Sequence, residues 1–99
     1  MPSHRAYVYI LRCGDGSLYI GTARDIAVRL AQHAAGKGAK YTRSRGPLEL
    51  IFQEGPMTVS RALRREHQLK QLTRPQKFAF IKGELEVKLV RRKPRRRRG

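Results

Sequence analysis

Two short segments near the start of the chain constrain the fold more than any other feature. Residues 6–12 (AYVYILR) and residues 18–22 (LYIGT) are rich in β-branched and aromatic side chains, as buried strands are. The five residues between them (CGDGS) are glycine, aspartate and serine apart from one cysteine, which is a turn-forming composition. Strand, turn and strand predict a β-hairpin, so the chain begins as an antiparallel sheet.

The segment after the hairpin predicts a helix and a third strand. Asp25 can cap a helix that runs to about Ala35, where Gly36 ends it. A basic loop over residues 37–46 then leads to residues 48–54 (LELIFQE), in which apolar side chains alternate with polar ones. Alternation of this kind is typical of a half-buried strand.

Two more helices follow. Thr58 can cap a helix through residue 72, and Pro75 suits the first turn of a short helix that ends near residue 82. The order ββαβαα predicts an α/β fold of the α+β type, a three-stranded antiparallel sheet flanked by helices. We expect one domain over residues 1–83, and residues 84–90 (ELEVKLV) as an edge strand or a linker.

The charge of the chain predicts its kind of partner. Its 23 Lys and Arg against 7 Asp and Glu give a net charge of +16. Residues 91–98 (RRKPRRRR) carry seven of those cations and no apolar side chain, so we expect residues 91–99 to be a disordered basic arm. Removing the seven cations still leaves +9. A basic folded part with a basic arm indicates a nucleic-acid partner.

Other features argue against a membrane or an extracellular location. No apolar run approaches the ~20 residues that span a bilayer, and the first five residues (MPSHR) lack the apolar stretch of a signal peptide. The single cysteine, Cys13, excludes an internal disulfide and fits a reducing compartment. We therefore expect no membrane partner and a cytoplasmic location.

A few polar residues on otherwise apolar elements are candidates for a site. They are Tyr7, Tyr9 and Tyr19 on the hairpin, Arg29 and His33 one turn apart on the first helix, and Glu66 on the second. Each has a structural explanation as well. The tyrosines can pack, Arg29 can pair with Asp25, Glu66 can pair with Lys70, and His33 can cap its helix. Taken singly, each position favours the structural explanation, and only the joint pattern can overturn it.

The joint pattern resembles a known family. Tyr7-Val8-Tyr9, followed ten residues later by Tyr19-Ile20-Gly21, resembles the paired motif of the GIY-YIG nuclease superfamily. Residues 25–30 (DIAVRL) with His33 resemble its first helix. Residues 37–43 (KGAKYTR) and 62–66 (ALRRE) are similar to a subfamily of small bacterial proteins related to the excision-repair incision domain. The resemblance covers roughly residues 5–82.

The resemblance implies hydrolysis of phosphodiester bonds with one Mg²⁺ or Mn²⁺ ion. Glu66 matches the metal-binding glutamate, and Tyr9 and Tyr19 match the motif tyrosines, one of which would orient or deprotonate the attacking water. Arg29 would stabilise charge on the phosphorus, and His33 would be a second polar helper. Two departures stand out: Tyr7 replaces the first glycine of the motif, and the sequence has no asparagine, which some members use.

The resemblance also implies a partner. We expect DNA, with RNA as an alternative, bound with little sequence selectivity, and a role in DNA repair at the bacterial nucleoid. Phosphate contacts are expected from the basic loop and the arm, namely Lys37, Lys40, Tyr41, Arg43, Arg45, Arg91, Arg92, Lys93, Arg95, Arg96, Arg97 and Arg98. Two alternatives stay open, a non-catalytic nucleic-acid-binding protein and a subunit directed by another repair protein. The sequence does not indicate the oligomeric state.

Overall fold

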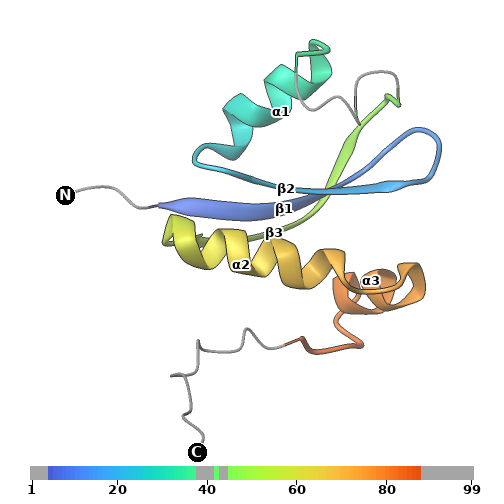
Figure 1. The fold of residues 1–99 in the computed structure, drawn as a ribbon. Helices are drawn as coiled ribbons and strands as arrows, with labels where there is room; N and C mark the ends of the chain where they lie inside the picture. The colour runs from blue at the N-terminus through green and yellow to red at the C-terminus, as the bar shows by residue number, and fades with distance from the viewer. Residues whose placement is uncertain (1–4, 38–41, 43–44, 88–99) are drawn as a thin grey trace, which may run out of the picture.

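A computed structural model describes residues 5–37, 42 and 45–87 of the chain. Its elements follow the order ββαβαα (Figure 1). They are β1 (Ala6–Arg12), β2 (Leu18–Ala23), α1 (Ile26–Ala34), β3 (Glu49–Met57), α2 (Val59–Lys70) and α3 (Arg74–Ile81). The strands form one antiparallel sheet in the order β2-β1-β3. The predicted fold class and element order are confirmed.

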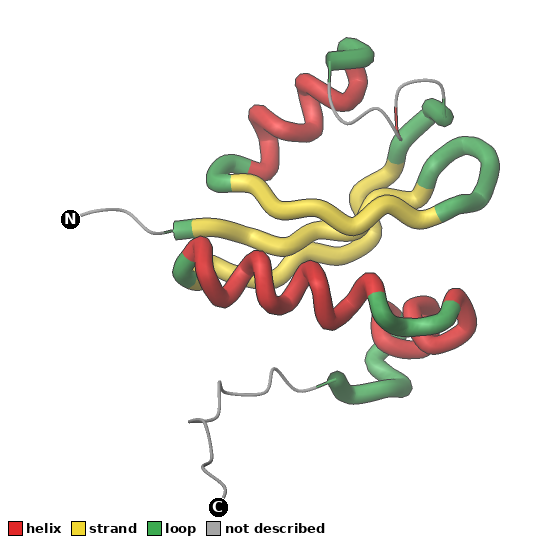
Figure 2. Tube along the Cα trace, viewed as in Figure 1, coloured by secondary structure: helices red, strands yellow, loops and turns green. Residues whose placement is uncertain are grey.

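Both faces of the sheet are covered by helices. Figure 1 shows α1 on one side of the sheet and α2 with α3 on the other, and Figure 2 shows the same layers coloured by structure type. Because side chains alternate along a strand, β1 sends Val8 and Ile10 toward α2 and sends Tyr9 and Leu11 toward α1. The central strand is therefore buried on both faces, which explains its almost unbroken apolar sequence.

Two of the three helices begin after the cap that the sequence predicts, and the third has a cap that the sequence analysis did not name. The side chain of Asp25 accepts a hydrogen bond from the Val28 N–H at 3.1 Å, and that of Thr58 accepts one from Arg61 at 3.1 Å. Thr73 forms a reciprocal capping box with Gln76 at the start of α3. These caps satisfy N–H groups that have no partner inside the helix.

The third strand is longer than predicted. It continues through Gly55 and Pro56 to Met57, which pairs with Ala6 across a shift in register. Proline lacks an N–H and is tolerated in edge strands and at bulges. Because β3 is an edge strand with a bulge at this point, Pro56 does not end it.

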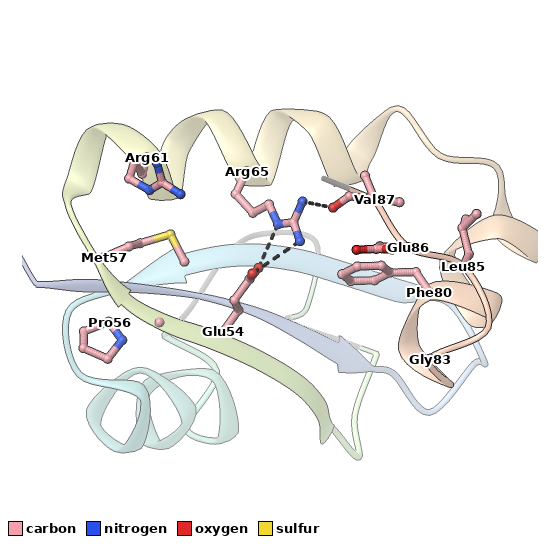
Figure 3. A pocket seen from close by; sticks show the side chains of 11 residues that line it. Glu54, Pro56, Met57, Arg61, Arg65, Phe80, Gly83, Leu85, Glu86 and Val87 are labelled. Carbon is pink, nitrogen blue, oxygen red and sulfur yellow. Dashed lines mark hydrogen bonds and ion pairs between the residues drawn. The ribbon is translucent and has the colours of Figure 1, made fainter. Parts of the chain in front are cut away.

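A buried arginine on α2 binds the segment that follows α3 by a hydrogen bond. Arg65 on α2 is 6% exposed and donates two hydrogen bonds to the Glu54 carboxylate on β3, at 2.7 and 3.3 Å. It also donates to the backbone carbonyl of Val87 (Figure 3) and lies over the ring of Phe80. A buried charge needs such partners. The predicted edge strand at residues 84–90 is not formed by residues 84–87, and residues 88–90 lie outside the described residues.

A concavity lies beside Arg65. It is bounded by β3, α2, α3 and residues 83–87, and Figure 3 shows its lining side chains. None of the residues predicted for the site lines it. Within the described residues, no helix is long and apolar enough to cross a membrane.

Candidate active site

Three of the predicted site residues meet between the hairpin and α1. The ring centroids of Tyr9 and Tyr19 are 6.2 Å apart, those of Tyr19 and His33 are 5.4 Å apart, and those of Tyr9 and His33 are 5.9 Å apart. Tyr9 is 1% exposed and His33 is 3% exposed, whereas Tyr19 is half-buried. The cluster therefore has a buried interior and one ring at its border.

The register of the hairpin creates this cluster, and Gly21 makes room for it. Gly21 lies opposite Tyr9, and Tyr19 lies opposite Leu11. A Cβ atom at Gly21 would lie 2.7 Å from Tyr9 Oη and 2.9 Å from Tyr19 Cε2, closer than real side chains approach. Sequence analysis used Gly21 only as part of the motif. A glycine inside a strand is itself a signal of close approach.

A second glycine accommodates the departure from the motif at Tyr7. A Cβ atom at Gly55 on β3 would lie 2.8 Å from Tyr7 Cδ2 and 2.8 Å from the backbone oxygen of Ala6. Gly55 also has a φ of +140°, which glycine adopts without strain. The bulky side chain of Tyr7 therefore fits because Gly55 on the neighbouring strand has no side chain.

His33 joins Tyr9 to a residue that sequence analysis did not single out. Tyr9 Oη lies 2.9 Å from His33 Nε2, and His33 Nδ1 lies 2.8 Å from Thr42 Oγ1. Thr42 is 2% exposed. Both ring nitrogens of His33 are thus engaged by side chains, and the alternative that His33 caps the end of α1 is wrong. Thr42 was missed because no local pattern marks a single threonine in a basic loop.

Burial and nearby charge set the protonation of the cluster. Burial raises the pKa of Tyr9 far above its usual value, and the charge of Tyr19 adds to this, while Arg29 opposes it. Burial also lowers the pKa of His33, and Arg29 lowers it further. At neutral pH the phenol of Tyr9 is therefore protonated and the imidazole of His33 is neutral.

Arg29 lies near the cluster and is not paired with Asp25. Its charge acts on both Tyr9 and His33. Asp25 instead caps α1 through the Val28 N–H, and the described side chains show no ion pair between Asp25 and Arg29. The alternative that Arg29 serves only as a partner for Asp25 is therefore wrong.

Glu66 lies on α2, across the sheet from α1, and has a structural partner. Its carboxylate pairs with Lys70 at 2.8 Å and the side chain is 20% exposed, so the structural alternative for this residue is present. Its charge nevertheless raises the pKa of Tyr9. The helix that carries it packs against β1 and also along the edge strand β2.

The donor set suits a hard, hydrated cation better than a soft one. In the described part of the chain, no three His, Cys, Asp or Glu side chains gather as a metal cage. Mg²⁺ commonly keeps several waters and binds through one or two carboxylates together with substrate phosphates. A single, partly exposed carboxylate at Glu66 fits that mode of binding.

Few of the residues predicted to contact phosphate fall within the described residues. Lys37 is exposed just after α1. Arg45 is paired with Asp15, which neutralises part of its charge. Lys40, Tyr41, Arg43 and the arm residues 91–98 lie outside the described residues.

Comparison with known proteins identifies the family. The family model described as the GIY-YIG catalytic domain matches residues 5–79, more than half of the chain. The chain belongs to the GIY-YIG family. This is a nuclease family, which acts on nucleic acid and generally uses a divalent metal ion. The matched range includes Tyr9, Tyr19, Arg29, His33 and Glu66.

Relatives of this GIY-YIG domain match over most of their length. A UPF0213 protein of Staphylococcus epidermidis is 52% identical over 75 residues, which cover 76% of this chain and 92% of the relative. A UPF0213 protein of Staphylococcus aureus is 49% identical over 82 residues, which cover 83% of this chain and 98% of the relative.

Two solved structures share the fold. The solution NMR structure of the UPF0213 protein BH0048 from Bacillus halodurans is 42% identical, with a TM-score of 0.54 over 81% of this chain and 85% of that one. The NMR structure of protein EF2693 from E. faecalis is 38% identical, with a TM-score of 0.58 over 91% and 97%. Their names state no activity, so the activity of this GIY-YIG domain is argued from its site.

Proposed function

We propose that this chain is a metal-dependent endonuclease that hydrolyses phosphodiester bonds in DNA. The observation that carries the proposal is the buried contact between Tyr9 and His33, with Tyr19 at its border and the charges of Arg29 and Glu66 beside it. Hydrolysis of a phosphodiester needs a group that takes a proton from water, a cation for the phosphorus centre and a carboxylate for a metal ion. Tyr9 with His33, Arg29 and Glu66 are the residues that we propose for these three roles.

Each residue has a role that follows from its surroundings. Tyr9 stays protonated at neutral pH, so it can accept a proton from water only while passing its own to His33. Tyr19 is half-buried and orients the water at the border of the cluster. Arg29 stabilises negative charge on the phosphate. Glu66 would hold Mg²⁺ or Mn²⁺, which when bound stabilises the leaving oxygen and polarises the phosphate.

DNA is the proposed substrate because of the charge of the chain. Phosphate contacts from Lys37 and from the basic residues of the loop and the arm would hold DNA without selecting a sequence. We propose a role in DNA repair or processing at the bacterial nucleoid, in the cytoplasm, with another repair protein directing the enzyme to its target.

One observation favours a second candidate function. The ion pair between Glu66 and Lys70 occupies the carboxylate that would hold the metal ion. A protein in which this pair persists on DNA would bind nucleic acid without cleaving it. The two candidates differ in a single measurable property, which is metal-dependent cleavage.

The test is nicking of supercoiled plasmid, single-stranded DNA and branched DNA in Mg²⁺ or Mn²⁺ by wild type and by Glu66→Gln. The matched control is Glu84→Gln, which changes an exposed carboxylate after α3. We expect nicking by wild type and Glu84→Gln and none by Glu66→Gln. Binding without cleavage by all three proteins would favour the non-catalytic candidate.

A further inference from the structure

Thr42 is a buried polar residue in the loop between α1 and β3, and its hydroxyl lies next to the imidazole of His33. It is 2% exposed, and Oγ1 is 2.8 Å from His33 Nδ1. The opposite ring nitrogen, Nε2, is 2.9 Å from Tyr9 Oη. Three buried side chains from β1, α1 and the loop thus form one chain of hydrogen bonds.

The protons in this chain depend on one another. A neutral imidazole carries a hydrogen on only one nitrogen, and the partner of that nitrogen fixes which one. If Tyr9 donates its phenol proton to Nε2, the hydrogen of His33 must be on Nδ1, where an acceptor is needed. The hydroxyl oxygen of Thr42 has lone pairs at hydrogen-bond distance.

We propose that Thr42 is a positioning residue that holds His33 as the Nδ1–H tautomer and so leaves Nε2 free to accept the phenol proton of Tyr9. This proposal rests on the proposed nuclease function, and it names the group that keeps the proton acceptor in its competent form. Thr42 touches neither substrate nor metal in this scheme and acts through His33.

The step that this arrangement supports conserves every proton. The attacking water gives a proton to Tyr9 Oη while Tyr9 gives its own to His33 Nε2, and the water oxygen bonds to phosphorus. The bond from phosphorus to the leaving oxygen breaks, and solvent water protonates that oxygen. The imidazolium keeps its Nδ1–H bond to Thr42 and later releases its extra proton to solvent.

Several titratable and charged groups face this chain of hydrogen bonds. Arg29 faces it from α1, Tyr19 from β2, and the charge of Glu66 reaches Tyr9 from α2. The cation of Arg29 opposes a charged His33. The charged form of His33 is therefore disfavoured, which suits a group that must return its proton.

The test compares Thr42→Val, which keeps the shape and loses the hydroxyl, with Thr42→Ser, which keeps the hydroxyl. The first readout is the tautomer of His33, measured from the ¹⁵N chemical shifts of its ring in the full chain without DNA or metal. We expect Nδ1–H in wild type and Thr42→Ser, and a population of Nε2–H in Thr42→Val. An Nε2–H tautomer in wild type, or an unchanged Nδ1–H tautomer in Thr42→Val, would overturn the proposal.

The second readout is the steady-state rate of cleavage over a range of DNA concentrations. A positioned general base contributes about 10²–10⁴-fold, so partial loss of the tautomer in Thr42→Val should lower kcat by roughly 10- to 100-fold with KM unchanged. Thr42→Ser should recover most of this loss. If wild type cleaves no DNA, the nuclease function fails, while the tautomer measurement still decides the role of Thr42.

Discussion

Replacing Gly21 by alanine tests whether the strand glycine is what allows the two tyrosines to meet. The added Cβ would lie 2.7 Å from Tyr9 Oη, and ordinary contact begins at 3.4 Å, so the hydroxyl must retreat by about 0.7 Å. It cannot do so freely, because Tyr9 is buried and bonded to His33. A displacement of 1 Å at a reacting group can cost about 10²-fold in rate.

The expected result is a loss of activity out of proportion to the loss of stability. Alanine in a strand is favoured over glycine by roughly 0.5–1 kcal/mol, while overpacking costs about 1–3 kcal/mol. We therefore expect Gly21→Ala to lower the free energy of unfolding by no more than about 2.5 kcal/mol and the single-turnover rate of cleavage by about tenfold or more.

The assays are guanidinium unfolding and single-turnover cleavage, with Gly46→Ala as the control. Nothing lies within 4 Å of a Cβ at Gly46, and its φ is not positive, so this variant should leave both quantities unchanged. A Gly21→Ala protein that is more stable than wild type and cleaves at the same rate would refute the reasoning.

Two further predictions concern pH and salt. Burial lowers the pKa of His33 below 6.5. The unfolded chain therefore binds a proton at this histidine at higher pH than the folded chain does. The contribution of His33 to the free energy of unfolding is thus fully present above pH 6.5 and is lost as the pH falls below that value. The thermal midpoint of wild type should therefore drop on acidification more steeply than that of His33→Gln, and equal slopes would contradict this. Deleting residues 91–99 should flatten the dependence of log affinity for DNA on log salt by about 0.9 for each phosphate that the arm neutralises, and an unchanged slope would exclude the arm from binding.

The sequence predicts the fold well where local chemistry decides the structure. Asp25 and Thr58 precede α1 and α2 as caps, Pro75 lies in the first turn of α3, and the turn residues after β1 reverse the chain. These signals act within a few residues of each other. The continuation of β3 through Pro56 was missed because it depends on the bulge opposite Ala6, which only the paired strands define.

The candidate site is less predictable because its contacts join residues far apart in the chain. The spacing of Arg29 and His33 places them on one helix face, but it does not show that His33 reaches Tyr9. Thr42 lies in the segment KGAKYTR that resembles the subfamily, but nothing in that segment marks it as a site residue. The resemblance therefore identifies only some of the residues that the packing brings together.

A single residue can have both a structural role and a proposed role in the site. Glu66 pairs with Lys70 and still acts on Tyr9 through its charge. An ion pair spaced by four residues on a helix contributes only about 0.3–0.5 kcal/mol, and Lys70 is exposed while Glu66 is partly exposed. Losing it should not unfold the protein, so Glu66→Gln is a clean variant for separating binding from chemistry.

The central claim is that this site breaks phosphodiester bonds, and its most direct test measures binding and cleavage on the same DNA. Wild type and Glu66→Gln would each be titrated with labelled branched DNA and then supplied with Mg²⁺. We expect equal or slightly tighter binding by Glu66→Gln, because one negative charge is removed, and cleavage by wild type alone. Equal cleavage by both proteins, or cleavage by wild type that persists without a divalent metal ion, would contradict the claim.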